Sequence, residues 1–153
     1  MRITDFLRAE RIAPDLKATD KTAALAELAD LFGGNDQVDH DAVLQAMVER
    51  EQAASTGMEY GVAVPHGRLK TAGGLVGVLG RSRQGIEFGA LDGRPAHLLF
   101  GLVGPSADMS GLMLKALARI SRLCKNADFR ARLMGAGGAE EMFRVMNEED
   151  AKY

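Results

Sequence analysis

The sequence predicts an α/β protein in which helices cover both faces of a β-sheet. Residues 74–80 and 96–103 are apolar segments of strand length, and the second is almost continuously apolar, as in an inner strand covered on both faces. Segments with the apolar spacing of helices precede and follow these strands. Strands in the middle of a chain with helices on either side favour a sheet between two helical layers.

The composition fits a single domain over residues 1–153. Hydrophobic residues make up 46% and charged residues 26%, which excludes a disordered chain, a collagen-like chain and a disulfide scaffold. A chain of this length can bury roughly 70% of its unfolded surface without a disulfide or metal. The 19 Lys+Arg against 21 Asp+Glu give a net charge of −2, which argues against a nucleic-acid partner or a membrane-surface partner.

We also expect a cytoplasmic protein that does not insert into a membrane. Residues 1–13 carry scattered charges and lack the uninterrupted apolar stretch of a signal peptide. Nowhere does the sequence contain the run of ~18 apolar residues typical of a membrane helix. The one cysteine, Cys124, has no partner for an internal disulfide.

The first third of the chain is predicted to form a short helix, an edge strand and two longer helices. Residues 3–7 have helical spacing, and the proline-containing segment 12–16 fits an edge strand. Thr19-Asp20 and Asp39 are expected to supply the caps of the two longer helices, and residues 33–35 to end the first of them. The residues expected to face the core from these helices are Ala23, Leu25, Leu28, Ala29, Leu31, Phe32, Val43, Leu44, Met47 and Val48.

Several strands and then three helices are predicted for the rest of the chain. Residues 62–64 form a short β-branched strand before Pro65-His66-Gly67, and residues 85–88 are predicted to form another between the two apolar strands. Helical spacing returns in residues 114–124, 128–134 and 139–146.

The turn around His66 is the segment with the clearest chemical potential. Pro65 fixes its own φ and has no N–H, and Gly67 allows a sharp turn and the close approach of another surface. We therefore expect His66 to lie at the end of a strand, where ligands commonly bind in open α/β sheets. From these three residues alone, a plain turn is an equally good interpretation.

No metal and no cofactor are expected. The three histidines, His40, His66 and His97, lack metal-ligand spacing. The glycines at 73–74 and 135–138 are not followed by the Lys-Ser/Thr of a phosphate-binding loop.

The surroundings of His66 resemble the phosphohistidine motif of IIA domains of the fructose/mannitol class in the bacterial phosphoenolpyruvate-dependent phosphotransferase system. The matching residues are Arg50-Glu51, Ser55-Thr56-Gly57 and Gly61-Val62-Ala63-Val64-Pro65-His66-Gly67. The similarity extends from the start of the chain to the helix at 114–121, so it covers nearly the whole sequence. It implies a mixed five-stranded sheet with helices on both faces, and a chain of this length without attached domains is similar to the nitrogen-regulatory branch.

The resemblance implies a phosphocarrier in which His66 accepts a phosphoryl group from a phosphorylated HPr-like protein. A neutral imidazole with a pKa of about 6.5 is nucleophilic near pH 7. Arg50 matches the family's active-site arginine and is expected to stabilise the phosphoryl oxygens. Ser55, Thr56 and the backbone at Gly57 are expected to add hydrogen-bond donors. Taken alone, Arg50 is better explained as a solvated charge at a helix end beside Glu49 and Glu51, and only the surrounding motif reverses that preference.

Two positions depart from the family pattern. Glu59 replaces a glycine and is expected to add negative charge near the phosphoryl group. Met113 occupies the position where many members carry a second histidine, and it can neither donate a strong hydrogen bond nor carry charge.

Two functions therefore stay open. The first is an active phosphocarrier that relays the group, for example to a IIB domain, or signals with it. The second is a degenerate, poorly phosphorylated module that docks to a regulatory target protein. His66 and Arg50 favour the first, whereas Met113 and Glu59 favour the second.

Overall fold

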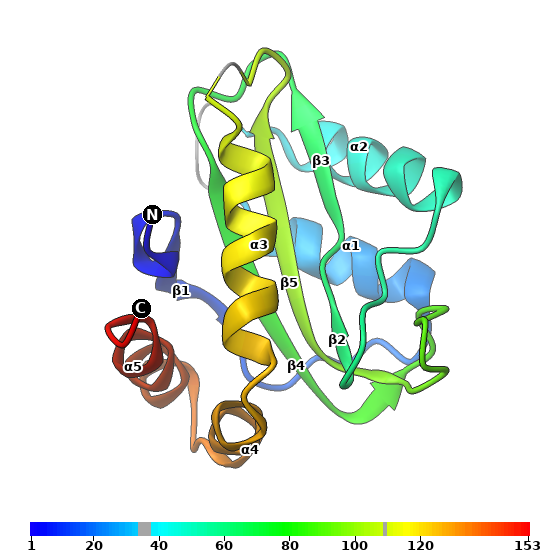
Figure 1. Ribbon diagram of the computed structural model, residues 1–153. Helices are drawn as coiled ribbons and strands as arrows, with labels where there is room; N and C mark the ends of the chain where they lie inside the picture. Colours follow the sequence, from blue (N-terminus) through cyan, green and yellow to red (C-terminus); the bar gives the residue numbers. More distant parts are fainter. Residues whose placement is uncertain (34–37, 109) are drawn as a thin grey trace.

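A mixed β-sheet lies between two layers of helices (Figure 1). The computed structural model describes residues 1–33, 38–108 and 110–153, and within them five strands form one sheet in the order β1-β4-β5-β2, with β3 also paired to β5. The strands are β1 (Leu7–Ala13), β2 (Val62–Ala63), β3 (His66–Leu69), β4 (Val76–Ile86) and β5 (Ala96–Pro105). The predicted fold class is confirmed.

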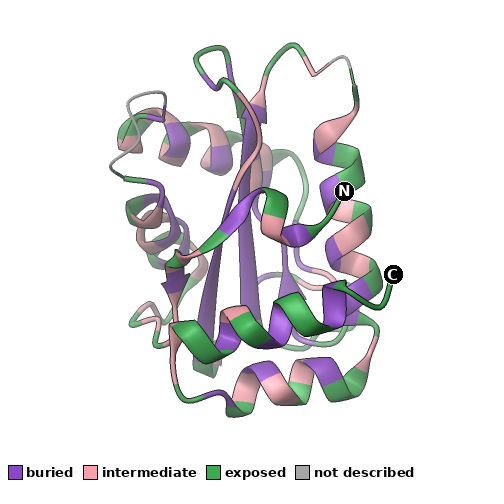
Figure 2. Cartoon of the chain, turned by 90° about the vertical axis from the view of Figure 1, so that its left-hand side faces the viewer, coloured by how far each residue is buried: buried purple, intermediate pink, exposed green. Residues whose placement is uncertain are grey.

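The pairing explains why the sheet is mixed. Strands β4 and β5 are antiparallel, whereas β1 is parallel to β4, and β2 and β3 are both parallel to β5. The short strands β2 and β3 follow each other along the same edge of β5, with Val62 opposite Leu98 and His66 opposite Leu102. Figure 2 shows the sheet almost wholly buried, as the apolar run of β5 predicted.

Each face of the sheet is covered by its own helices. Helices α1 (Lys21–Leu31) and α2 (His40–Ala53) pack on one face, and α3 (Leu112–Cys124), α4 (Ala127–Gly135) and α5 (Ala139–Asp150) on the other. The predicted caps of α1 and α2 are confirmed, because Asp20 accepts a hydrogen bond from the Ala23 N–H at 2.8 Å and Asp39 from the Ala42 N–H at 3.1 Å.

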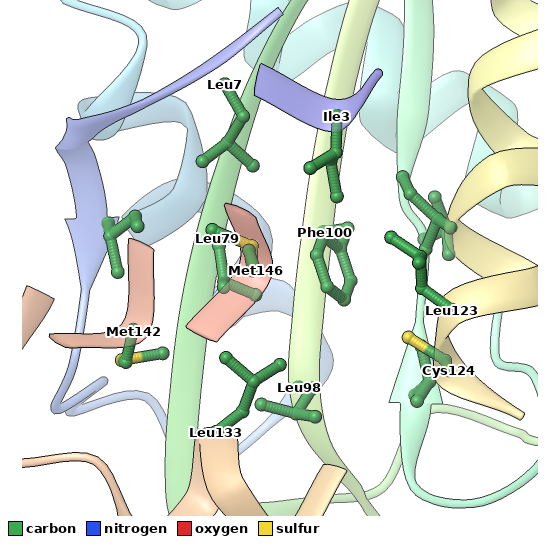
Figure 3. Packing of buried hydrophobic residues seen from close by; sticks show 14 of the residues in the cluster. Ile3, Leu7, Leu79, Leu98, Phe100, Leu123, Cys124, Leu133, Met142 and Met146 are labelled. Carbon is green, nitrogen blue, oxygen red and sulfur yellow. The ribbon is translucent and has the colours of Figure 1, made fainter. Parts of the chain in front are cut away.

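The sheet separates two hydrophobic clusters. Successive residues of β5 contribute to opposite clusters, Phe100 to the cluster under α3–α5 and Leu99 to the cluster under α1 and α2. Figure 3 shows the first cluster, in which side chains of the sheet meet those of α3, α4 and α5. Of the described helices, none combines the length and apolar composition required to cross a membrane.

Several predicted boundaries differ from the structure. Only a 3-10 turn, η1 (Ile3–Asp5), forms at the start, and the edge strand begins at Leu7 because Leu7 pairs with Gly77 of β4. No separate strand forms at 85–88, since β4 continues to Ile86. His66 begins β3 and does not end the preceding strand. Residues 34 and 35, part of the predicted end of α1, lie outside the described residues.

Candidate functional site

The backbone around His66 is held by its neighbours on both sides. Pro65, which lies between β2 and β3, accepts a hydrogen bond through its carbonyl from the Leu102 N–H at 3.0 Å. Val64 donates its N–H to the Thr56 carbonyl at 3.1 Å. His66 is therefore fixed by strand pairing and by a loop contact, and its side chain is half-buried.

One ring nitrogen of the His66 imidazole is hydrogen-bonded to the backbone. Its Nδ1 lies 2.8 Å from the Val64 carbonyl oxygen, which can only accept, so Nδ1 carries the hydrogen and Nε2 keeps the free lone pair. Burial lowers the pKa of His66 below its ordinary 6.5, and Arg50 and Arg68 lower it further, against the Val64 hydrogen bond and Glu51, which raise it. The ring is thus mainly neutral and nucleophilic at pH 7.

His66 opens into a cleft of about 560 Å³ at the edge of the sheet. Three elements form it: α2 from one helical layer, β3 from the sheet and α3 from the other layer. Figure 1 shows β3 between α2 and α3. The lining residues are Ala46, Glu49, Arg50, His66, Gly67, Arg68, Met113, Leu114 and Leu117.

A close contact between β3 and α2 brings Arg50 to this cleft. A Cβ atom at Gly67 would lie 2.8 Å from the Ala46 Cβ, so the two elements can approach this closely only because residue 67 is glycine. Ala46 and Arg50 are four residues apart and share one face of α2. The Arg50 Nη1 donates to the Ala54 carbonyl at 2.8 Å, which orients the guanidinium through one of its five N–H groups.

Arg68 is a cleft residue that the sequence reasoning missed. It follows His66 by two positions on β3, so both side chains lie on the same face of the strand, and this alternation was the available signal. The Arg68 Nη1 lies 3.4 Å from Asp108 Oδ2. With Arg50, Arg68 gives the cleft two guanidinium groups beside His66, an arrangement suited to an anion.

The N-terminus of α3 is already occupied by the carboxylate of Asp108. The Met113 and Leu112 N–H groups donate to it at 2.9 and 2.8 Å, and these bonds hold the pKa of Asp108 below its ordinary value. Two of the N–H groups at the positive end of the helix are therefore already paired inside the protein.

Ser55, Thr56 and Gly57 lie outside the cleft lining. Ser55 Oγ donates to the Phe88 carbonyl at 2.6 Å, Thr56 Oγ1 donates to Glu51, and the Gly57 N–H donates to Ser55 Oγ at 3.0 Å. The sequence predicted that these groups would donate to a phosphoryl group. In the structure their donors are used to fold the loop after α2.

The comparisons with known proteins agree with this architecture. Residues 5–149 match the family model described as "Phosphoenolpyruvate-dependent sugar phosphotransferase system, EIIA 2". The chain belongs to this EIIA family. The nitrogen regulatory protein of Bradyrhizobium diazoefficiens is 37% identical to it over 150 residues, or 95% of each chain. The fructose-specific EIIA component of Haloferax volcanii is 33% identical over 140 residues, which cover 91% of this chain and 90% of that one.

Solved EIIA structures share the fold. The crystal structure of the nitrogen regulatory protein IIA-Ntr from Neisseria meningitidis superposes with a TM-score of 0.87 at 29% identity and covers 94% of this chain and 98% of its own. IIA mannitol from Escherichia coli, at 20% identity, covers 91% of this chain and 97% of its own with a TM-score of 0.77, a likeness of fold alone.

The structure separates the two departures from the EIIA pattern. Met113 lines the His66 cleft and is 2% exposed. Glu59 instead borders another pocket, of about 390 Å³, together with Tyr60 and Leu91. Its charge is therefore not part of the His66 cleft. Among the described residues no group of three or more His, Cys, Asp and Glu side chains could hold a metal ion.

Proposed function

We propose that this EIIA protein is a cytoplasmic phosphocarrier with a regulatory role that accepts a phosphoryl group on His66 from a phosphorylated HPr-like protein. The observation that carries this proposal is the fixed imidazole: the Val64 carbonyl holds Nδ1–H, and Nε2 keeps its lone pair beside two guanidinium groups. Membership of the EIIA family supports the reaction class.

The transfer needs placement and charge stabilisation more than covalent help. The lone pair of His66 Nε2 attacks the phosphorus atom, and the bond between phosphorus and the donor nitrogen breaks as its electron pair returns to the donor. Arg50 and Arg68 stabilise the negative charge on the three peripheral oxygens. No proton has to leave Nδ1, which stays bonded to the Val64 carbonyl.

The regulatory role is supported by relatives that are named nitrogen regulatory proteins, one of which is 37% identical to this chain. The Bradyrhizobium nitrogen regulatory protein is covered over 95% of its length. The relatives also include a fructose-specific EIIA component. If this chain acts in sugar transport instead, the expected role is to pass the phosphoryl group on to a IIB domain.

A second function, docking to a regulatory target without efficient phosphorylation, is favoured by one observation. Position 113 of the cleft carries methionine, which cannot stabilise phosphoryl oxygens, while the neighbouring Leu114 is 72% exposed and offers an apolar contact. Phosphorylation assays separate the two functions directly.

The first test is incubation with phosphoenolpyruvate and the general phosphotransferase proteins. We expect one phosphoryl group per chain, stable in base and labile in acid. His66→Ala should abolish labelling, and His97→Ala, which changes a histidine outside the cleft, should retain it. Labelling of a folded His66→Ala protein at the wild-type rate would refute the assignment, and a wild type that binds a partner but is not labelled would support the docking function.

A further inference from the structure

Behind Arg50 lies a buried carboxylate that the transfer chemistry does not use. The Glu51 side chain is 5% exposed and sits at the end of α2. It accepts hydrogen bonds from the Thr56 N–H at 2.9 Å and from the Thr56 hydroxyl. A buried carboxylate is tolerated only when it is paired and hydrogen-bonded, so this contact fixes the loop that follows α2.

Lys21 supplies the opposite charge from another helix. Its Nζ lies 2.9 Å from Glu51 Oε2 and 4.7 Å from the centre of the Phe88 ring. Lys21 is the first residue of α1, so the ion pair joins the start of α1 to the end of α2. The carboxylate thereby connects three segments: both helices and the loop at Thr56.

Thr56 is connected to both backbone carbonyls that orient Arg50 and His66. The Ala54 carbonyl, which accepts from Arg50 at 2.8 Å, lies two residues before it. The Thr56 carbonyl accepts from the Val64 N–H at 3.1 Å, and the Val64 carbonyl in turn accepts from His66. Both backbone acceptors that orient Arg50 and His66 are therefore tied to the position of Thr56.

We propose that Thr56, Glu51 and Lys21 form a positioning unit that sets Arg50 against the phosphoryl group on His66. They are positioning residues, because they affect the rate through Arg50 and do not touch the phosphoryl group. This inference rests on the proposed phosphorylation of His66. It assigns to the threonine of the Ser55-Thr56-Gly57 motif a role in geometry in place of phosphate binding.

The test compares two substitutions of one side chain. Thr56→Val keeps the shape and the N–H but removes the hydroxyl donor, and Thr56→Ser keeps the donor. We expect Thr56→Val to lower kcat for phosphorylation about tenfold, with little change in KM for the phosphorylated donor protein, because small displacements of a positioned group cost this much in rate. Thr56→Ser should stay near wild type, as should the control Thr71→Val, which alters an exposed threonine.

A double-mutant cycle with Arg50→Lys shows whether the effect passes through Arg50. We expect Thr56→Val to add little to the loss already caused by Arg50→Lys, since coupled residues are not additive. Lys21→Met should likewise slow phosphorylation in the wild type but add little in the Arg50→Lys background. It serves as the second variant if Thr56→Val does not fold. Full multiplication of the two losses would overturn the inference, as would a folded Thr56→Val protein with wild-type kcat.

A spectroscopic measurement separates this inference from the proposed function. The NMR signals of Arg50 Nε–H and His66 Nδ1–H should move in Thr56→Val and return in Thr56→Ser, whether or not the protein is phosphorylated. A wild type that takes no phosphoryl group would refute the function, whereas unchanged signals in a protein that is phosphorylated would refute the positioning unit alone.

Discussion

His66 combines a fixed tautomer with a half-buried position beside two guanidinium groups. Burial, Arg50 and Arg68 all disfavour its protonated form and lower its pKa below 6.5, although the Val64 carbonyl and Glu51 act in the opposite direction. The ring therefore stays neutral to a lower pH than a free imidazole does. Its reactive form is available over the whole neutral range.

We expect the ring signals of His66 to titrate with a midpoint below 6.5. Because the unfolded histidine takes up its proton at higher pH, the contribution of His66 lowers the free energy of unfolding as the pH falls from 6.5 towards the folded pKa, and it has no effect above 6.5. The free energy of unfolding in urea should be measured against pH for wild type and for His66→Gln. The difference between the two curves isolates the contribution of His66, because the other titrating groups contribute equally to both. A midpoint at or above 6.5 would contradict the account.

Position 113 tests whether a second imidazole would help. Met113 lines the cleft but is 2% exposed. We expect Met113→His to be phosphorylated about 10- to 100-fold faster, because a ring donor can stabilise phosphoryl oxygens. Burying that polar ring should lower the free energy of unfolding by about 2 kcal/mol. Met113→Leu is the control without a donor, and equal rates for both folded variants would show that residue 113 does not reach the phosphoryl group.

The contact of β3 with α2 depends on the missing side chain of Gly67. We expect Gly67→Ala to lower the free energy of unfolding by about 1–3 kcal/mol, because its Cβ would lie 2.8 Å from the Ala46 Cβ. To relieve this contact α2 would have to move away from β3, which should displace Arg50 and slow phosphorylation.

Ala46→Gly provides the matched control for this prediction. On its own it should lower stability by about 1 kcal/mol through helix propensity. In the Gly67→Ala background it should restore only part of the phosphorylation rate, because the new Cβ would still lie 3.1 Å from the Ala46 carbonyl carbon and 3.2 Å from the Met47 nitrogen. Urea unfolding and labelling of the four proteins measure both effects. Additive losses in the double variant would mean that the contact does not set the position of α2.

Local patterns predicted where the longer helices and the inner strands lie better than where the strands end. Asp20 and Asp39 were recognisable as caps because capping depends on residues three positions apart. The extension of β4 to Ile86 and the division of the edge strand at Pro65 depend on pairing with β5, which no local pattern contains.

The residues of the candidate site could be predicted from the sequence motif, but the direction of their side chains could not. The motif pointed to His66 and Arg50, and the structure brings them into one cleft. The hydroxyl of Thr56 was expected to face a phosphoryl group, but it turns to Glu51, and whether a hydroxyl points into a cleft or back to a helix end depends on the tertiary path of the loop. Arg68 was overlooked because its closeness to the site depends on β3 continuing after His66.

One buried arginine holds distant parts of the protein together. Arg81 of β4 is fully buried, and its guanidinium donates to the carbonyls of Pro14, Leu133 and Ala136 at 2.9, 2.8 and 2.7 Å. It thereby joins the sheet to the segment after β1 and to the end of α4. Its partners are neutral carbonyl groups at these three positions.

We expect Arg81→Met to lower the free energy of unfolding by about 3 kcal/mol or more, because the carbonyl groups would be left buried without donors. Arg83→Met is the control: Arg83 contacts Asp15 on the surface, and its loss should change stability by about 0.5 kcal/mol or less. Urea unfolding of both variants checks the difference. Equal effects would show that the buried bonds contribute no more than a surface ion pair.

The placement of the cleft at the meeting of both helical layers divides its tasks between them. Helix α2 contributes the charge of Arg50, β3 contributes the imidazole of His66, and α3 contributes the apolar side chains of Met113, Leu114 and Leu117. These layers have separate cores on opposite faces of the sheet. Substitutions on α3 can therefore change the apolar side of the cleft while the α2 side keeps the charge of Arg50 beside His66.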